Sequence, residues 1–338
     1  MFAEHRKQPR YSAAGSMNHI LITGGAGFIG SHLTEACLLD GDDVTVLDNL
    51  STGRMENLQT VSTNRRFHFV EGDIQDAALL DRLICKCDLV YHLAGAVGVR
   101  KVIASPLQTL ATNFLGTKNV FDACAQHGRK VVFASTSEVY GKSVKPTFLE
   151  SDDLLLGNTS VGRWGYACAK ALDEFLAFAE AKERALRFVI LRYFNTIGPR
   201  QLPDHGMVVP RLLGQAAGNE PLTVFGDGSA SRCFMHVADA VEATRLLAAC
   251  PGAEQQVVNV GNPEPITILE LARRIISLTG SRSTIQHVDP RKIYDADFED
   301  MATRVPDITR LQKLTRFSPR RNLENAIRDC FQHLPRRT

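Results

Sequence analysis

The sequence has almost no excess charge of either sign and no long apolar stretch. Its 338 residues include 39 Lys and Arg against 37 Asp and Glu, for a formal net charge of +2 at pH 7. A chain so nearly neutral has no overall positive potential that would attract polyanions, so we expect no nucleic-acid partner. No segment approaches the roughly 20 apolar residues that a membrane helix needs. The first 19 residues are polar, so we also expect no secretory signal peptide.

Cysteine occurs eight times but without the spacing of a metal site. Only Cys85 and Cys87 lie close together, and no Cys-x-x-Cys pair recurs with Cys or His at zinc spacing. Scattered cysteines of this kind are typical of reduced, mostly buried thiols. We therefore expect a cytoplasmic protein without a metal.

The overall composition is that of an ordinary globular protein. Hydrophobic residues make up 44% of the chain and charged residues 22%. A chain of about 300 residues can hide roughly three quarters of its unfolded surface. The sequence contains no internal repeats and no low-complexity blocks. Residues 1–17 are expected to form a flexible leader ahead of the folded part.

Short apolar segments alternate with segments of helical spacing between residues 19 and 192. The expected strands are 19–23, 44–48, 67–70, 89–93, 130–134 and 188–192, and the expected helices are 28–39, 77–84, 107–127 and 165–183. This alternation predicts an α/β fold, a Rossmann-type doubly wound parallel sheet with helices on both faces. We assign 18–194 to this domain, with a returning strand near 257–260. The proline-punctuated part, 195–335, is expected to be mostly a smaller substrate-binding lobe.

A glycine-rich loop follows the first expected strand. Gly24, Gly27 and Gly30 are spaced three residues apart, and Phe28 and Ile29 open the helix that follows. A tight turn, a close approach to pyrophosphate and close helix packing each exclude a Cβ atom at such positions. The helix N-terminus offers free N–H groups and a partial positive charge to phosphates. The loop therefore predicts a dinucleotide-binding site.

Residues at the ends of the next strands extend this site. Asp48 ends the second strand, 18 residues after Gly30. A carboxylate there can bind the ribose hydroxyls of adenosine and would repel the extra phosphate of NADP, so NAD is the expected cofactor. Asp73 has a competing role as a helix N-cap. The further cofactor-binding residues expected at these strand ends are Asn49, Asp73, Ile74, Leu93, Ala94 and Gly95.

A tyrosine and a lysine lie four residues apart in the expected helix 165–183. Tyr166 and Lys170 share one helical face. A nearby ammonium group favours the phenolate and lowers the pKa of a tyrosine, as a base for a sugar hydroxyl requires. Such a pair occurs often by chance, and the glycine loop upstream is what favours a catalytic role.

Together these motifs resemble the extended short-chain dehydrogenase/reductases, the NAD-dependent nucleotide-sugar epimerase/dehydratase group. The resemblance covers about residues 18–330 and includes three further segments: 135–141 (Ser-Thr-Ser-Glu-Val-Tyr-Gly), 192–200 (Arg-Tyr-Phe-Asn-Thr-Ile-Gly-Pro-Arg) and 232–239 (Arg-Cys-Phe-x-His-Val-x-Asp). It implies a triad of Thr136, Tyr166 and Lys170. In such enzymes the tyrosine takes the proton of the sugar C4 hydroxyl while hydride passes to NAD, and a 4-keto sugar results.

The resemblance also implies further contacts. Asn113 is expected at the cofactor, alongside Tyr166 and Lys170. The residues expected to bind the nucleotide sugar are Asn195, Val209 and Arg232, and a UDP-sugar is the expected substrate class. Members of the group usually dimerise through the two helices that correspond here to 107–127 and 165–183, so a homodimer is expected.

The two residues after Thr136 bear on the reaction. Dehydratases of this group usually carry Asp-Glu there, and 4-epimerases tend to carry small residues without a Glu, whereas this chain has Ser137 and Glu138. Thr-Ser-Glu is similar to the UDP-glucuronate decarboxylases. In that branch a ketone at C4 lies β to the C6 carboxylate, which then leaves readily as CO₂. Ser137 and Glu138 would handle proton delivery at C5.

Two more segments resemble the same branch. Arg163-Trp164-Gly165-Tyr166 is similar to its lead-in to the catalytic tyrosine, and 294–308, which contains Arg304, is similar to its C-terminal pattern. Arg304 would bind the sugar carboxylate through a bidentate fork. Other sugar epimerases use an Arg near this position for the diphosphate, so Arg304 does not settle the substrate.

Several functions therefore stay open. UDP-glucuronate decarboxylation to a UDP-4-keto-pentose or UDP-xylose is favoured over 4-epimerisation of a UDP-hexose or UDP-glucuronate, and over sugar 4,6-dehydration. A different class is a non-catalytic NAD-binding regulator on the same fold. The intact Thr136, Tyr166 and Lys170 speak against a regulator, which would have no reason to keep all three.

Overall fold

A parallel sheet of seven strands organises the part of the chain that the structure describes. The structure is a computed structural model, and it describes residues 17–96, 105–202, 207–289, 301 and 303–334. The strands lie in the order β11-β6-β5-β4-β1-β2-β3, and every neighbouring pair is parallel. Their bounds are β1 His19–Thr23, β2 Asp43–Asp48, β3 Phe67–Glu71, β4 Leu89–His92, β5 Lys130–Thr136, β6 Arg187–Tyr193 and β11 Gln256–Val260. The α/β Rossmann-type prediction is confirmed.

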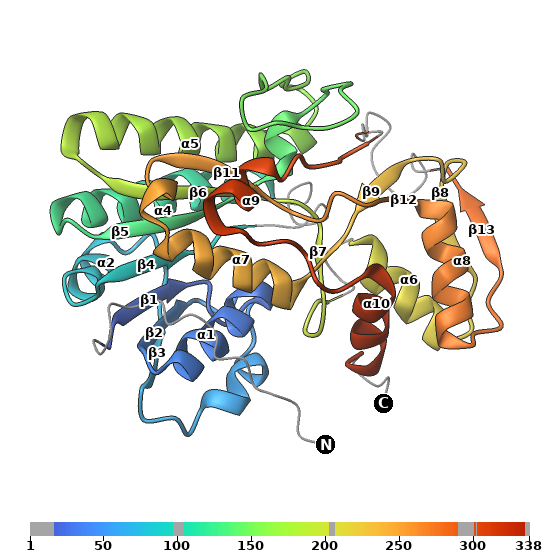
Figure 1. The fold of residues 1–338 in the computed structure, drawn as a ribbon, viewed down its shortest axis with the longest axis horizontal. Coiled ribbons are helices and arrows are strands. Elements are labelled where there is room, and N and C mark those ends of the chain that lie inside the picture. The colour runs from blue at the N-terminus through green and yellow to red at the C-terminus, as the bar shows by residue number, and fades with distance from the viewer. Residues whose placement is uncertain (1–16, 97–104, 203–206, 290–300, 302, 335–338) are drawn as a thin grey trace.

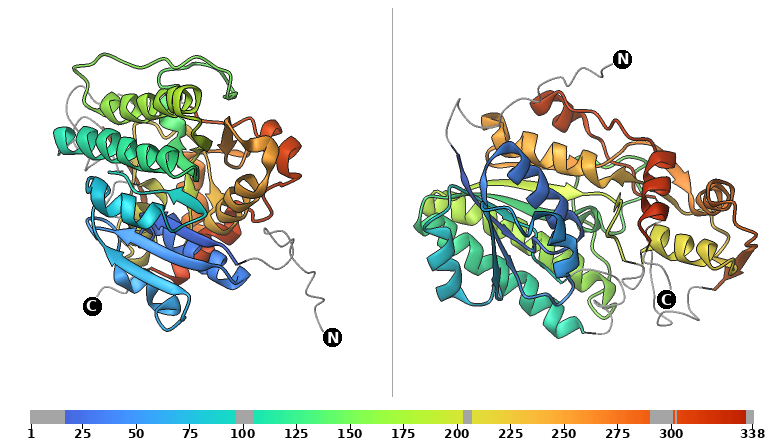
Figure 2. Two further views of the ribbon diagram at one scale, coloured as in Figure 1. Left: turned by 90° about the vertical axis from the view of Figure 1, so that its left-hand side faces the viewer. Right: turned by 90° about the horizontal axis from the view of Figure 1, so that it is seen from below.

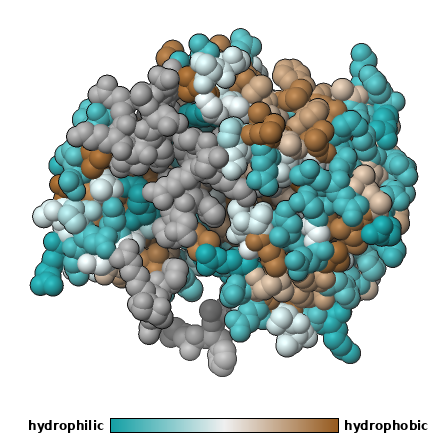
Figure 3. Space-filling view, turned by 180° about the vertical axis from the view of Figure 1, so that it is seen from behind, coloured by the Kyte–Doolittle hydropathy of each residue, from teal (hydrophilic) through white to brown (hydrophobic). Residues whose placement is uncertain are grey.

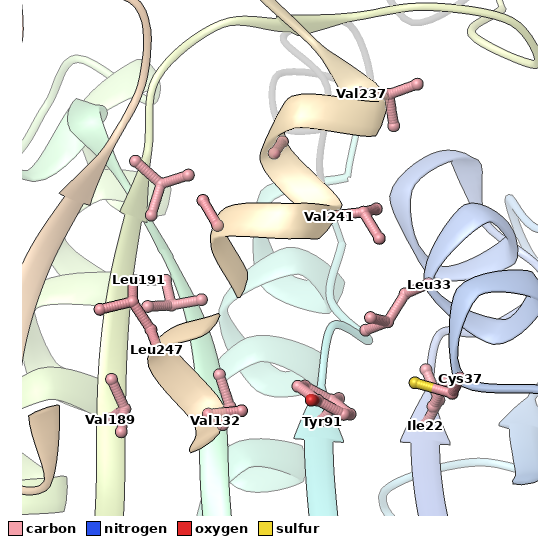
Figure 4. Packing of buried hydrophobic residues seen from close by; sticks show 14 of the residues in the cluster. Ile22, Leu33, Cys37, Tyr91, Val132, Val189, Leu191, Val237, Val241 and Leu247 are labelled. Atoms are coloured by element: carbon pink, nitrogen blue, oxygen red, sulfur yellow. The ribbon is translucent and has the colours of Figure 1, made fainter. Parts of the chain in front are cut away.

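Helices cover both faces of the sheet (Figures 1 and 2). On one face lie α2 (Ala77–Ile84), α4 (Pro106–Gln126) and α5 (Arg163–Arg184), and on the other lie α1 (Phe28–Asp40), α7 (Val237–Ala249) and α9 (Thr309–Thr315). In the close view of the second face, Leu247 of α7 lies beside the strands, while Val241 of α7 and Leu33 of α1 lie between the two helices (Figure 4). Because both faces are covered, the strands carry nearly continuous apolar runs instead of alternation.

A smaller lobe stands at one end of the sheet, at the right of Figure 1. Its helices are α6 (Val208–Ala217), α8 (Ile268–Thr279) and α10 (Leu323–Gln332), and its strand pairs are β8 (Leu222–Phe225) with β13 (Ile285–Val288), β9 (Ser231–Cys233) with β12 (Pro265–Thr267), and β7 (Thr196–Ile197) with β10 (Met235–His236). The three helices bury a separate apolar core. The chain returns from this lobe to the sheet as β11, which pairs in parallel with β6.

Some elements were not expected from the sequence. They are the helices α6 to α10, the 3-10 helices η1 (Met55–Val61), η2 (Ser137–Tyr140) and η4 (Pro251–Ala253), and the short strand pairs of the lobe. Strands of two to four residues are too short to show a period, and their partners are remote in sequence. Residues 1–16 of the expected leader lie outside the described residues.

The strand order reverses between β1 and β4, and doubly wound sheets bind ligands at the carboxyl ends around such a point. In the register of this pair, Thr23 stands opposite His92. The glycine loop follows β1, and Leu93 follows β4. The fold therefore brings the predicted cofactor residues to one edge of the sheet.

Candidate active site

The glycine loop has the geometry of a phosphate cradle. Gly24 has a φ of +73°, and a Cβ atom there would lie 2.6 Å from the backbone nitrogen of Ala94. A Cβ atom on Gly30 would overlap the carbonyl oxygen of Gly24. Gly27 is the N-cap of α1, and the first turn has neither a side-chain cap nor an acidic residue. The N–H groups at this helix end, including those of Phe28 and Ile29, thus suit the pyrophosphate of NAD.

Replacing Gly30 by Ala is expected to weaken NAD binding at least tenfold. The added methyl group would displace the carbonyl of Gly24 and with it the loop that receives the phosphates. Isothermal titration of NAD into the purified protein measures the effect. Gly214→Ala in α6 is the matched control, because a Cβ atom there meets nothing within 4 Å. It should leave NAD affinity unchanged and raise Tm slightly, since Ala favours a helix. Equal NAD affinity in the Gly30 variant and the wild type would contradict this role of the loop.

Asp48 ties the loop to the end of β2. Its carboxylate accepts N–H bonds from Ala26 at 3.0 Å and from Leu50 at 2.8 Å. Burial raises the pKa of Asp48, and these two N–H groups oppose that rise. A carboxylate has about four acceptor sites, so it can hold the loop and still accept a ribose hydroxyl.

Asn49 and Asp73 come together at the ends of β2 and β3. The Asn49 amide donates to Asp73 at 2.7 Å, and Asp73 also accepts the N–H of Gln75 at 2.8 Å. The helix that follows is capped by Asp76 and not by Asp73, so the competing N-cap role for Asp73 is wrong. Ile74 lies in the core below, where its side chain fills the space beside Gly116.

The segment after β4 is fixed by Asn113 of α4. Its side chain donates to the carbonyl of Ala96 and accepts the N–H of the same residue. Gly95 lies against the same amide, and Ala94 lies against Gly24. Leu93 donates its N–H to the carbonyl of Thr23. Asn113 thus shapes the wall of the cofactor site through the backbone.

The predicted triad is assembled from two elements. Thr136 is the last residue of β5, while Tyr166 and Lys170 lie one turn apart in α5. The Thr136 side chain lies close enough to the Tyr166 hydroxyl to oppose the rise in the pKa of Tyr166. The Lys170 ammonium is buried 4.1 Å from the centre of the Phe133 ring and 3.6 Å from the carboxylate of Asp173. This arrangement holds a phenol, a hydroxyl and a cation at the carboxyl end of the central strands.

The pKa of Tyr166 departs from the expectation. Burial raises it, the negative charge of Glu138 raises it further, and the nearby Thr136 side chain opposes both. The prediction that the pKa of Tyr166 is lowered by Lys170 is therefore wrong for the protein without bound molecules. Burial also lowers the pKa of Lys170, against the opposing charges of Asp173 and Glu174. Because its pKa is lowered, the Lys170 ammonium group stabilises a phenolate less well than the sequence predicted.

Glu138 lies between two arginines. Its carboxylate is 2.5 Å from a guanidinium nitrogen of Arg304 and 3.1 Å from one of Arg163. Burial alone would raise the pKa of Glu138, but the charges of Arg304, Arg163 and Arg232 outweigh it, and the pKa is lowered. Glu138 is therefore ionised at neutral pH. Ser137, the other residue expected in proton delivery, is buried beside it in η2.

Arg163 was missed as a site residue, although it opens the Arg-Trp-Gly-Tyr segment. Its position three residues before Tyr166, on the same helical face, is the signal that points to it. Arg304 was expected to bind a carboxylate, and it already contacts one, that of Glu138. The residues 294–300 of the C-terminal pattern lie outside the described residues.

The expected nucleotide-sugar residues lie where the lobe joins the sheet. Asn195 stands between β6 and β7, and its amide donates to the carbonyl of Cys233 at 3.3 Å. Arg232 lies in β9, mostly buried and close enough to Glu138 to lower its pKa. Val209 is buried in the lobe core, with 1% of the residue exposed.

Metal sites and membrane-spanning helices are both absent from the described ranges. Among these residues, no group of three or more His, Cys, Asp or Glu side chains has the arrangement of a metal site. None of the helices found there is long and apolar enough to cross a bilayer.

Comparisons with known proteins agree with this geometry. The model of the NAD dependent epimerase/dehydratase family matches residues 20–261. UDP-N-acetyl-alpha-D-glucosaminuronate decarboxylase of Bacillus cytotoxicus is 39% identical over 92% of this chain and 96% of its own length. UDP-glucuronic acid decarboxylase 1 of Danio rerio is 36% identical over 94% of this chain and 72% of its own length.

A solved structure gives the same result for the fold. UDP-glucuronic acid 4-epimerase from Bacillus cereus, in complex with UDP-glucuronic acid and NAD, superposes with a TM-score of 0.84 at 29% identity, covering 94% of this chain and 98% of that one. The resemblance inferred from the motifs is confirmed: the chain belongs to the NAD-dependent epimerase/dehydratase family.

Proposed function

We propose that the protein removes CO₂ from a UDP-linked hexuronate, with UDP-glucuronate as substrate and a UDP-4-keto-pentose or UDP-xylose as product. The observation that carries the proposal is the contact of Arg304 with a carboxylate, that of Glu138, beside the Tyr166 site. An arginine that binds one carboxylate there can exchange it for the C6 carboxylate of a substrate. The decarboxylase names of the similar proteins support the same reaction.

The residues of the site have separate tasks in this reaction. Tyr166 accepts the proton of the C4 hydroxyl, and Lys170 supports the resulting negative charge. With NAD held in the glycine loop, the site would have an acceptor for the C4 hydride; the hydride would return to C4 if the product is UDP-xylose and would leave as NADH if it is the UDP-4-keto-pentose. Arg304 orients the C6 carboxylate, which leaves as CO₂ once C4 is a ketone, and its bonding electrons remain as an enolate. The enolate then takes up a proton at C5 from a water molecule, which the Ser137 hydroxyl and the ionised Glu138 carboxylate would hold in place.

A second substrate is favoured by one observation. The 39% identical relative is named for UDP-N-acetylglucosaminuronate, which differs at C2 and keeps the C6 carboxylate. The same tasks for Tyr166 and Arg304 serve both sugars. The 4-epimerase with UDP-glucuronic acid supports the alternative in which the carboxylate is bound but retained.

An NMR time course of the purified protein with NAD and either UDP-glucuronate or UDP-N-acetylglucosaminuronate tests the proposal. Release of CO₂ with a UDP-linked pentose or its 4-keto form is the expected result for UDP-glucuronate. Release of CO₂ from the N-acetylated sugar alone would show that UDP-N-acetylglucosaminuronate, and not UDP-glucuronate, is the substrate. Formation of UDP-galacturonate with all carbons retained would replace decarboxylation by 4-epimerisation. No change in either sugar would contradict both.

We also propose a homodimer that pairs through α4 and α5. Each helix exposes large apolar side chains, and Leu107 and Phe175 are 81% and 69% exposed. The others of this α4–α5 face are Leu110, Leu115, Leu172 and Phe178. Figure 3, seen from behind Figure 1, has brown apolar side chains at its upper right, the side on which α4 and α5 lie. Exposed apolar surface of this kind is typical of an interface.

Light scattering after gel filtration is expected to give about twice the mass of one 37.2 kDa chain. Phe175→Glu should give the single-chain mass, because a charge buried in the interface lacks a partner. Leu39→Glu in α1 is the control, since Leu39 is 86% exposed outside the α4–α5 face. A wild type that elutes with the mass of one chain would contradict the dimer.

A reducing compartment, the cytoplasm, is proposed for the protein. All eight cysteines are free thiols, and Cys85 and Cys87 do not pair despite their closeness in sequence. Burial raises the pKa of the Cys37 and Cys87 thiols to about 12, so these two stay protonated and unreactive at neutral pH.

A further inference from the structure

A chain of buried polar side chains runs from the cofactor wall to the catalytic lysine. It joins Thr23 of β1, His92 of β4, Thr117 of α4 and Asp173 of α5, each buried. Thr23 Oγ1 lies 2.7 Å from His92 Nδ1, His92 Nε2 lies 3.1 Å from Thr117 Oγ1, and Thr117 Oγ1 lies 3.3 Å from Asp173 Oδ2. None of these contacts has a task in the reaction described above.

The two ends of this chain fix the direction of its hydrogen bonds. At one end the backbone N–H of Ala94 can only donate, and it donates to Thr23 Oγ1 at 3.3 Å. At the other end an ionised Asp173 can only accept. Thr117 therefore gives its single hydroxyl proton to Asp173 and accepts from His92 Nε2–H. His92 Nδ1 is then bare and accepts from the Thr23 hydroxyl, so every donor points toward Asp173.

Asp173 stands one helical turn after Lys170 and is fully buried. One carboxylate oxygen receives Thr117 and lies 3.6 Å from the Lys170 ammonium. The other oxygen is buried and has no hydrogen-bond partner among the described residues. The charged or titratable neighbours are Lys170 and Glu174 of α5, His92 of β4, and Tyr166 of α5, whose pKa the charge of Asp173 raises. Glu174 is itself paired with Arg192 of β6 at 2.6 Å. Lys170 is therefore the cation that Asp173 faces.

We infer that Asp173 is a positioning residue that keeps the Lys170 ammonium charged and directed at Tyr166, and that the Thr23–His92–Thr117 chain holds Asp173 for this task. The inference rests on the proposed catalytic use of Tyr166 and Lys170. Lys170 is buried against an aromatic ring, where an ammonium group without a counter-charge tends to lose its proton. A carboxylate supplied by the same helix prevents that loss.

The pKa shift of Lys170 agrees with this role, because burial lowers its pKa and Asp173 is the largest opposing charge. Burial raises the pKa of Asp173 to about 7, with Lys170 and Thr117 opposing. Asp173 is therefore fully ionised only above that pH, and it supports the charge of Lys170 most strongly in the mildly alkaline range. Burial, followed by the charge of Lys170, puts the pKa of His92 well below its usual value, so His92 stays neutral, as the direction of the chain requires.

The pH dependence of kcat in Asp173→Asn tests the inference. Without the carboxylate the pKa of Lys170 falls, so the alkaline limb of the profile should move about one to three units to lower pH. Glu183→Gln removes the same charge from an exposed position of α5 and should leave the limb in place. A lower Tm with an unshifted limb would assign Asp173 a purely structural role and overturn the inference. Absence of turnover in the wild type itself would count instead against the proposed function.

A second measurement needs no substrate. The nitrogen chemical shifts of His92, assigned among the ten histidines by loss of one signal set in His92→Gln, report its tautomer. The expected state in the NAD-loaded wild type is the neutral Nε2–H form through the neutral and mildly alkaline range. An Nδ1–H tautomer would reverse the hydrogen bond between His92 and Thr117, and a charged ring would reverse the one between His92 and Thr23. Either result would overturn the inference even if Asp173→Asn fails to fold.

Discussion

Replacing Tyr166 by Phe is expected to lower kcat for UDP-glucuronate by about 100- to 10,000-fold, the usual contribution of a positioned acid–base group. The variant keeps the ring, its packing in α5 and the Lys170 beside it. It loses the oxygen that accepts the C4 proton and that lies near Thr136. NAD affinity should change by less than about tenfold, since one hydrogen bond is lost. Single-turnover absorbance of NADH and titration of NAD measure the two effects separately.

Tyr193→Phe is the matched control for this experiment. The Tyr193 hydroxyl is buried and bonds Thr244 of α7 at 2.5 Å, on the face of the sheet away from α5. Its loss should cost about 1 kcal/mol of stability and leave kcat unchanged. Full activity of the Tyr166 variant would show that another group takes the C4 proton, and the decarboxylation scheme would then lose its first step.

Replacing Arg304 by Lys is expected to raise KM for UDP-glucuronate by about 10- to 150-fold, the equivalent of one charge-assisted hydrogen bond of roughly 1.5–3 kcal/mol. A lysine keeps the charge but loses the planar fork that grips a carboxylate. Inhibition by UDP-glucose, which has no carboxylate at C6, should be nearly unaffected. The ratio of the two effects isolates recognition of the carboxylate from binding of the nucleotide.

Arg187→Lys is the control for Arg304. Arg187 also forms a fork with a carboxylate, that of Glu254, but on the exposed side of β6 far from Tyr166. Surface pairs of this kind contribute little to stability, and neither KM nor inhibition should change. If the Arg304 variant binds UDP-glucuronate and UDP-glucose equally weakly, Arg304 contacts the diphosphate and not the sugar carboxylate. That result would favour the 4-epimerase alternative.

The sequence was enough to predict the parts of the site that are local in the chain. The glycine loop depends on a strand, three glycines and a helix within a dozen residues, and Tyr166 and Lys170 depend on one turn of one helix. The loop can be recognised from its spacing, and the Tyr166–Lys170 pair from its spacing together with the loop upstream. The parallel sheet and the coverage of both its faces followed from the alternation of apolar and helical segments, because parallel strands need crossovers.

Contacts between remote segments could not be predicted in the same way. The bond between Glu138 and Arg304 joins residues 166 positions apart, and the chain from Thr23 to Asp173 crosses two strands and two helices. Nothing in local spacing indicates that His92 faces Thr117. The predicted fall in the pKa of Tyr166 was wrong for the same reason, because burial and the charge of Glu138 both depend on tertiary packing.

The return of the chain to the sheet as β11 has a consequence for how the protein folds and comes apart. After β6 the chain forms part of the lobe and then returns to the sheet as α7 and β11. It next forms β12, α8 and β13 in the lobe, packs α9 on the sheet, and ends in the lobe with α10. The sheet edge and the lobe core are therefore each completed only by segments that are synthesised late. No single cut near residue 194 separates two self-sufficient pieces. Heating should accordingly unfold the sheet and the lobe in one cooperative transition.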